Sequence, residues 1–272
     1  MENKITFSFE ILGSGTSCGV PCPGCRCGVC RSDDARDKRF RQAGLLRFSN
    51  GINMLIDCGT DIRTELLRTG LRTLDYILIT HDHADHIHGL NDLVPFTKRK
   101  EIPIYLSHGS LRKLQSTYSF LFNGGMEAKG KFELKILNEK NLINGIEIVK
   151  VPVFHGIFEI CGFRIGNLAY LTDVSRIPDE SYDLLKGVEY LFIDGLCNHV
   201  HPSHFSYGEA LDEIEKIRPK YAWLIHVTHN ETYAEIEDFI QKQYSLRPGL
   251  DGITVHSAYD GLVIENLICY SI

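Results

Sequence analysis

The chain has 272 residues, of which 43% are hydrophobic and 24% charged, and its net charge is −6 at pH 7. This composition is typical of a globular protein, and the acidic balance argues against broad binding of nucleic acid. The apolar runs are too short to span a membrane, and the N-terminus lacks the basic and apolar regions of a secretory signal. We therefore expect a cytoplasmic protein with few disulfides and, since no linker or repeat is visible, a single domain over residues 1–272.

Strands dominate both halves of the chain. Apolar and β-branched runs bounded by Gly, Asn or Asp predict strands at 5–13, 44–48, 52–57, 74–80, 132–137, 146–154, 163–173, 188–195, 221–227 and 261–270. Helices are expected at 60–70, 110–122, 206–217 and 231–244, the first closed by Gly70 and the third begun by Ser206. This order predicts two sheets packed face to face, with helices covering their outer faces.

A cluster of histidines and aspartates directly follows the strand expected at 74–80. The segment HDHADHIH contains, within eight residues, the side chains of His81, His83, Asp85, His86 and His88. The end of a strand that runs into a loop and a helix can turn such neighbours toward one point, and imidazole and carboxylate groups suit Zn²⁺ and related divalent ions. The segment therefore predicts a metal site.

Other polar residues also end apolar strands. They are Asp57 in MLIDCG, His155 in VPVFHG, Asp173 in LAYLTDVS and His226 in AWLIHVTH. Together with the His-x-His-x-Asp-His segment, this ordered set of motifs resembles the metallo-β-lactamase superfamily over nearly the whole chain, from Gly13 to about His229. The resemblance implies an αβ/βα sandwich of the α/β class, with two mixed sheets packed face to face and helices on the outer faces.

The resemblance also implies two divalent metal ions, zinc or manganese, in the active site. The ligands of the first ion would be His81, His83 and His155. The ligands of the second would be Asp85, His86 and His226. Asp173 would bridge the two ions, and Asp57 would orient ligands or hold a proton. His88 lies beyond this set, and we expect it to be structural.

Two adjacent cations lower the pKa of a water that they share, so hydroxide is available near neutral pH. That hydroxide can attack an electrophilic phosphorus or carbonyl carbon, while the ions stabilise the charge that develops on oxygen. Asp85 would serve this chemistry as both ligand and catalytic residue. No nucleophilic Ser or Cys is required.

Further segments resemble a phosphodiesterase branch of the superfamily, which includes the phosphoribosyl 1,2-cyclic phosphate phosphodiesterase of phosphonate breakdown. They are GSGTSCGVPCPGCRCGVC, THDHADHIHGLNDLVPF and HPSHFSYGEAL. In the last segment His204 precedes a helix, where the branch has a histidine near the metals, and we assign it as general acid or phosphoryl contact. The predicted activity is hydrolysis of a small or cyclic phosphate ester. Whether the chain forms a homodimer is left open.

The cysteines near the N-terminus predict a second kind of metal site. Cys25, Cys27 and Cys30 are too closely spaced for easy disulfides. In the phosphodiesterase branch, three cysteines at this spacing share a structural zinc with a histidine three residues after the last catalytic one, which here is His229. Cys22 could instead complete a site of four thiolates. We favour the set of three cysteines with His229, because it accounts for His229 as well as for the thiols.

Three other functions remain as alternatives. A ribonuclease Z-like tRNA-processing enzyme would use the same metals but needs a basic arm, which the short insert at 122–131 in an acidic chain does not supply. A thioester or lactone hydrolase would direct the same hydroxide at carbon. A non-catalytic zinc-binding accessory protein, like the superfamily member of the pyrroloquinoline quinone pathway, is disfavoured because the ligand set is intact.

Overall fold

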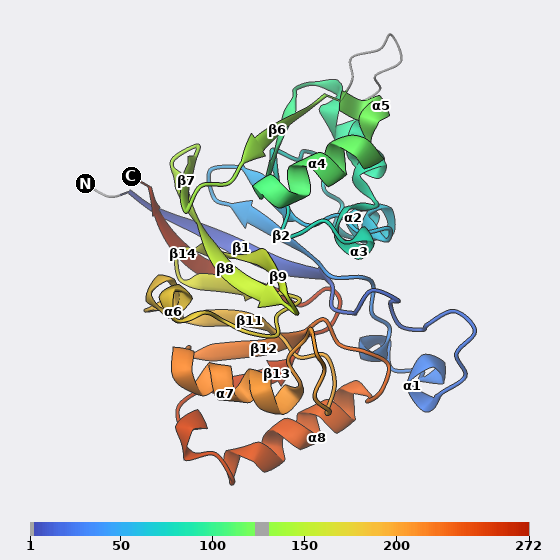
Figure 1. Cartoon of the computed structure of the whole chain (residues 1–272), viewed down its shortest axis with the longest axis vertical. Coiled ribbons are helices and arrows are strands. Elements are labelled where there is room, and N and C mark those ends of the chain that lie inside the picture. Colours follow the sequence, from blue (N-terminus) through green and yellow to red (C-terminus); the bar gives the residue numbers. More distant parts are fainter. Residues whose placement is uncertain (1–2, 123–130, 272) are drawn as a thin grey trace.

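The fourteen strands of the described part of the chain form two mixed sheets of seven strands that pack face to face (Figure 1). The computed structural model describes residues 3–122 and 131–271, so most of the insert at 122–131 lies outside the described residues. The first sheet has the order β14-β1-β2-β3-β4-β5-β6, and the second consists of β7 to β13 in sequence order. The sheets are joined along one edge, where Ser271 of β14 pairs with Ile146 of β8.

The strands of the first sheet are β1 (Asn3–Gly13), β2 (Ala43–Phe48), β3 (Asn53–Ile56), β4 (Tyr76–Leu78), β5 (Ile102–Leu106), β6 (Phe132–Ile136) and β14 (Val263–Ser271). Those of the second are β7 (Lys140–Ile143), β8 (Ile146–His155), β9 (Phe158–Ile165), β10 (Leu168–Leu171), β11 (Tyr190–Asp194), β12 (Tyr221–Ile225) and β13 (Thr254–Ser257). The strands near the joint are antiparallel, whereas β3 to β6 and β10 to β13 run parallel.

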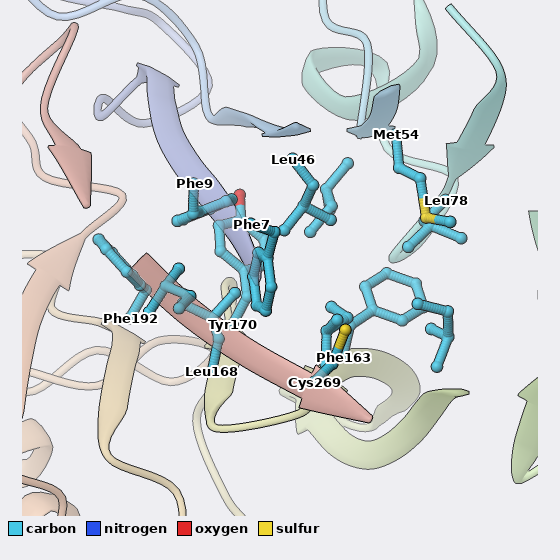
Figure 2. Close-up of a cluster of buried hydrophobic side chains, with 14 of the residues drawn as sticks. Phe7, Phe9, Leu46, Met54, Leu78, Phe163, Leu168, Tyr170, Phe192 and Cys269 are labelled. Atoms are coloured by element: carbon cyan, nitrogen blue, oxygen red, sulfur yellow. The ribbon is translucent and has the colours of Figure 1, made fainter. Parts of the chain in front are cut away.

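The main hydrophobic core lies between the two sheets, and Figure 2 shows part of it. Phe9 of β1 is fully buried there and packs edge-on against Phe192 and Tyr170, at ring-centroid distances of 4.8 and 5.7 Å. Edge-to-face contacts of this kind stabilise a core beyond the area that they bury. These large rings therefore hold the two sheets at a fixed distance.

Helices cover the outer face of each sheet (Figure 1). The first sheet is covered by α2 (Ile62–Thr69), α4 (His108–Thr117), α5 (Ser119–Phe122) and the 3₁₀ helix η2 (Leu90–Lys98). The second is covered by α6 (Asp179–Leu185), α7 (Tyr207–Ile217) and α8 (Tyr233–Tyr244). The shorter elements are α1 (Gly28–Arg31), α3 (Ala84–Ile87), η1 (Ala35–Asp37) and η3 (Pro248–Leu250). Among residues 3–122 and 131–271, no helix is long and apolar enough to cross a membrane.

The strands β5, β7 and β13 and the helix α6 were not predicted, and two predicted elements are divided in the structure. The helix expected at 110–122 is interrupted at Tyr118, whose hydroxyl donates a hydrogen bond to the carbonyl of Ile87 in the core. The strand expected at 163–173 is a hairpin of β9 and β10 that turns at Gly166, with φ at 54°. A Cβ there would lie 2.0 Å from the carbonyl oxygen of Ile268, so this turn requires glycine.

Candidate metal centre

The predicted site residues lie where strands end. Asp57 directly follows β3, His155 ends β8, His226 directly follows β12, and Asp173 comes two residues after the last residue of β10. Because parallel strands present their carboxyl ends at one edge of a sheet, β3, β4, β10 and β12 deliver these side chains to one end of the sandwich. The His81–His88 segment leaves β4 at this same end, so both sheets contribute to the site.

The structure brings all seven predicted metal ligands into two adjoining groups. One group contains His81, His83, His155 and Asp173, and the other contains Asp85, His86, Asp173 and His226. Within each group the potential ligand atoms all lie within 4.8 Å of one another. Asp173 belongs to both groups and is the residue for which the sequence predicted a bridging position.

Three of the imidazoles have their protonation fixed by a partner outside these groups. His155 Nδ1 lies 2.7 Å from the carbonyl oxygen of Ser203, and His86 Nδ1 lies 2.7 Å from the carboxylate of Asp57. A carbonyl oxygen and an ionised carboxylate only accept, so each Nδ1 donates its proton and Nε2 is the nitrogen left for another partner. His81 Nδ1 donates to Thr80 Oγ1 in the same way, because that hydroxyl gives its own proton to Asp57.

The remaining nitrogens fit a metal. The Nε2 atoms of His81, His86 and His226 are buried without a hydrogen-bond partner. His86 Nε2 lies 3.3 Å from an oxygen of both Asp85 and Asp173, and His226 Nε2 lies 3.4 Å from Asp173. Ligands held ~2.1 Å from zinc in a tetrahedron are ~3.4 Å apart. Buried lone pairs and carboxylates at this spacing suit divalent cations.

The charges of the centre are strongly coupled. Burial alone would lower the pKa of His86, but the carboxylates of Asp173, Asp57 and Asp85 outweigh burial and raise it well above its usual range. Burial would likewise raise the pKa of Asp173, but His226 and His86 hold it well below its usual range. The carboxylate of Asp173 is therefore ionised and available to a cation.

Three residues of the centre adopt the left-handed backbone conformation, which is costly outside glycine. They are Asp57, Asp173 and His226, with φ of 62°, 59° and 60°. Each lies just beyond the end of a strand, where this conformation turns the chain sharply. The turn directs the side chain into the centre instead of along the sheet.

Two glycines allow the loops of the centre to pack closely. A Cβ at Gly59 would lie 2.0 Å from the carbonyl oxygen of Asp85, and one at Gly89 would lie 2.0 Å from that of Gly59. Asp85 and His86 are on the short helix α3, so its position depends on the absence of these side chains. Gly59 is the last residue of the MLIDCG motif that contains Asp57.

His204 lies beside the two groups but in neither of them. Its ring centroid is 4.6 Å from that of His155 and 4.9 Å from that of His226. His204 Nδ1 donates to the carboxylate of Asp194, at 2.7 Å, which also accepts from the backbone N–H of Val174. Nε2 of His204 is therefore the atom free to meet a substrate.

Asp194 is a site residue that sequence reasoning missed. It ends the apolar strand β11, which is the pattern that identified Asp57, Asp173 and His226. Burial raises the pKa of Asp194, while the nearby His226 and the backbone N–H of Val174 favour its ionised form. One of its oxygens has no hydrogen-bond partner. Asp194, His204 and His226 also form a third group of potential ligand atoms within 4.8 Å of one another.

The predicted structural zinc ligands also meet. Cys25, Cys27, Cys30 and His229 form one group, with His229 Nδ1 3.5 Å from the sulfurs of both Cys25 and Cys27. Sulfur and nitrogen ligands of one tetrahedral zinc are ~3.6 Å apart, so these residues fit that ion. Cys22 lies outside this group, and its backbone N–H instead donates to the Cys30 sulfur.

A buried arginine holds the loop that contains His229. Arg39 is 1% exposed, and its guanidinium donates to the carbonyls of Thr228 and Glu231 on either side of that histidine. Asp37 pairs with Arg39 and accepts from the backbone N–H of Tyr233 at the start of α8. The N-terminal loop and the His229 loop are thus joined by protein contacts as well as by the four potential ligands.

His88, His199 and His201 belong to none of the four groups of potential ligand atoms found in residues 3–122 and 131–271. His88 is exposed at the end of α3, as expected for a residue outside the ligand set. The ring centroid of His201 is 5.2 Å from that of His204, so His201 lies at the margin of the site.

Comparison with known proteins agrees with this geometry. Residues 52–227 match the model of the β-lactamase superfamily domain. A solved diphosphatase of the PhnP family superposes with a TM-score of 0.86 and is 33% identical, covering 97% of this chain and 99% of its own.

Two curated relatives are also similar. The anti-Pycsar protein Apyc1 of Bacillus phage BSP38 is 43% identical over 247 residues, which are 80% of this chain and 92% of the relative. An octanoyltransferase of Porphyromonas gingivalis is 35% identical over 257 residues, which are 93% of this chain but 50% of the relative. The chain thus spans about half the length of that octanoyltransferase. The matched domain and the superposed fold together show that this chain belongs to the metallo-β-lactamase superfamily of metal-dependent hydrolases.

Proposed function

We propose that the protein is a metal-dependent phosphodiesterase that hydrolyses a small or cyclic phosphate ester. The observation that supports it most is the set of buried Nε2 atoms beside the carboxylates of Asp85 and Asp173, with a further imidazole, His204, held alongside. Zinc or manganese ions bound by these residues would supply Lewis acidity, which activates water near neutral pH and neutralises charge on a phosphoryl group.

The protein's own residues hold the ligands in place. Asp57 accepts hydrogen bonds from Thr80 and His86, and Ser203 accepts one from His155, so these imidazoles cannot rotate away. Such outer partners fix the tautomer and the direction of each lone pair. The burial of most of the ligands also excludes bulk water, which strengthens the electrostatic interactions within the site.

His204 would act on the substrate through Nε2. Because Nδ1 donates to Asp194, a protonated His204 can donate its second proton to a phosphoryl or leaving oxygen, and Asp194 stabilises the imidazolium. In the protein without substrate, burial lowers the pKa of His204. An anionic substrate oxygen would favour the protonated form again, so the proton would be bound when the phosphate arrives.

The relatives support phosphorus chemistry. The PhnP-family diphosphatase, which covers nearly the whole chain, is named for the cleavage of a phosphate linkage. We further propose that Cys25, Cys27, Cys30 and His229 bind a structural zinc that ties the N-terminal loop to the strand end holding His226.

The test is a panel of phosphate esters, including bis-p-nitrophenyl phosphate and several cyclic phosphates, assayed with zinc and with manganese. We expect turnover of at least one diester and loss of turnover in Asp173→Asn, while His88→Ala, outside the ligand groups, keeps it. Loaded wild-type protein that cleaves no phosphate ester would contradict the proposal.

A second candidate is hydrolysis of a thioester, which the octanoyltransferase relative suggests. The same residues could direct water at a carbonyl carbon instead of phosphorus. An octanoyl thioester should therefore be included in the panel. Turnover of the thioester without turnover of any phosphate ester would favour this second function.

A further inference from the structure

One buried imidazole of the metal centre is not oriented by a hydrogen bond of its ring. In His81, His86 and His155, Nδ1 donates to an oxygen of another residue. Both ring nitrogens of His226, in contrast, are buried without a hydrogen-bond partner in the described part of the chain. Nε2 of His226 lies 3.4 Å from the carboxylate of Asp173, so the direction of this ring depends on its backbone and on packing.

The backbone at His226 leaves the second sheet and hydrogen-bonds to residues beside the first. Ile225 is the last residue of β12 and still pairs with β11. At His226 φ is 60°, and the N–H donates to Oε1 of Gln42, which directly precedes β2, at 3.1 Å. The next N–H, that of Val227, donates to the carbonyl of Ser14, which directly follows β1. Residues that flank strands of the first sheet therefore hold the turn that directs His226 into the centre.

The amide of Gln42 is itself held on its other side. Gln42 is fully buried, and its Nε2 donates to the hydroxyl of Tyr170 at 2.9 Å. Because a backbone N–H can only donate, the atom that faces His226 is Oε1, which fixes the orientation of the amide. Tyr170 lies in the core between the sheets (Figure 2), on β10, three residues before Asp173. One buried amide thus connects His226 with the strand that leads to Asp173.

We propose that Gln42 is a positioning residue for metal binding, whose amide fixes the turn at His226 and thereby the separation of His226 Nε2 from the Asp173 carboxylate. This inference rests on the metal ions of the proposed function and adds a residue that belongs to none of the four groups of potential ligands in the described residues. An apolar side chain of the same length would fill the core without the cost of burying an amide. It would also leave the N–H of His226 without an acceptor, and that requirement explains a glutamine at this position.

The test titrates manganese into metal-free protein and measures the unbound ion by electron paramagnetic resonance. Carboxylates suit manganese, whereas thiolates favour zinc, so the titration reports the active site and not the cysteine site. We expect the wild type to bind two ions. Gln42→Met, which keeps the length of the side chain but has no amide, should bind one ion ~10- to 100-fold more weakly and the other unchanged. Tyr170→Phe, which removes the partner of the amide, should weaken the same ion ~3- to 10-fold.

Two matched controls should bind manganese as the wild type does. Gln115→Met alters an exposed glutamine of α4. Tyr244→Phe removes a hydroxyl on α8 that donates to the carbonyl of Ile253, outside the metal centre.

The outcomes separate this inference from the proposed function. Wild-type protein that binds two ions but cleaves no phosphate ester removes the phosphodiesterase and leaves the role of Gln42 standing. Unchanged binding of both ions in Gln42→Met overturns that role and leaves the phosphodiesterase standing. Equal weakening of both ions shows a general structural role and overturns the inference. A wild type that binds fewer than two ions overturns it together with the two-ion centre. If Gln42→Met does not fold, Tyr170→Phe decides by the same criteria.

Discussion

Replacement of Asp194 tests whether His204 depends on a buried charge. Asp194→Asn keeps an oxygen that can accept from both Val174 and His204 but removes the negative charge that faces the imidazole. A hydrogen bond to a charged group contributes ~1.5–3 kcal/mol, and each ~1.4 kcal/mol is a tenfold change in rate. We therefore expect kcat on a phosphate diester to fall ~10- to 100-fold. In Asp194→Ala, which also removes the hydrogen-bond acceptor, kcat should fall at least as far.

The assay is steady-state kinetics on metal-loaded protein, with metal content measured on the same samples. Asp194 lies outside the two main ligand groups, so both variants should retain the metal of the wild type. Asp183→Asn is the matched control, because Asp183 is an exposed surface carboxylate on α6. Wild-type kcat in Asp194→Asn would refute the reasoning. Loss of metal in parallel with kcat would show instead that Asp194 acts through His226.

Three further outcomes are expected. Cys27→Ser should bind one zinc fewer per chain by elemental analysis, and an unchanged count would contradict the structural site. Gly59→Ala should weaken binding of the active-site metal ~10- to 100-fold in a chelator competition, because its Cβ displaces the backbone of Asp85. Burial raises the pKa of Glu65 well above its ordinary value of 4.5, so wild-type stability should fall, by up to ~1.4 kcal/mol per pH unit, as pH rises from the ordinary to the raised pKa. Urea titrations of Glu65→Gln should show a flatter pH dependence, and parallel curves would refute this.

Much of the metal centre could be predicted because its residues follow one rule. Asp57, Asp173 and His226 each end an apolar run, and parallel strands bring such ends to one edge. Asp194 obeys the same rule, yet it was not identified, because an aspartate at a strand end is common and only its contact with His204 distinguishes it. That contact joins the end of β11 to the loop before α7, and their relative position cannot be inferred from the sequence.

The layers and most strands were predicted, but one hairpin was taken for a single strand. Gly166 and Asn167 separate two apolar runs, which is a signal of a two-residue hairpin turn that the prediction did not use. At Tyr118, by contrast, the helical pattern continues in the sequence, and the interruption arises from the hydrogen bond of its hydroxyl to a distant carbonyl. The pairing of His229 with cysteines about two hundred residues earlier came from family resemblance alone.

The position of β14 has a consequence for how the protein folds as it is synthesised. β14 lies between β1 and β8, and Asn3 of β1 pairs with Ser271. Until β14 has left the ribosome, β1 has an unpaired edge and the two sheets have no strand to join them. Such an edge can pair with other chains, so the nascent protein is most exposed to aggregation just before synthesis reaches β14. Among the described strands, the pairing of β1 with β14 has the greatest sequence separation and is also the last that can form.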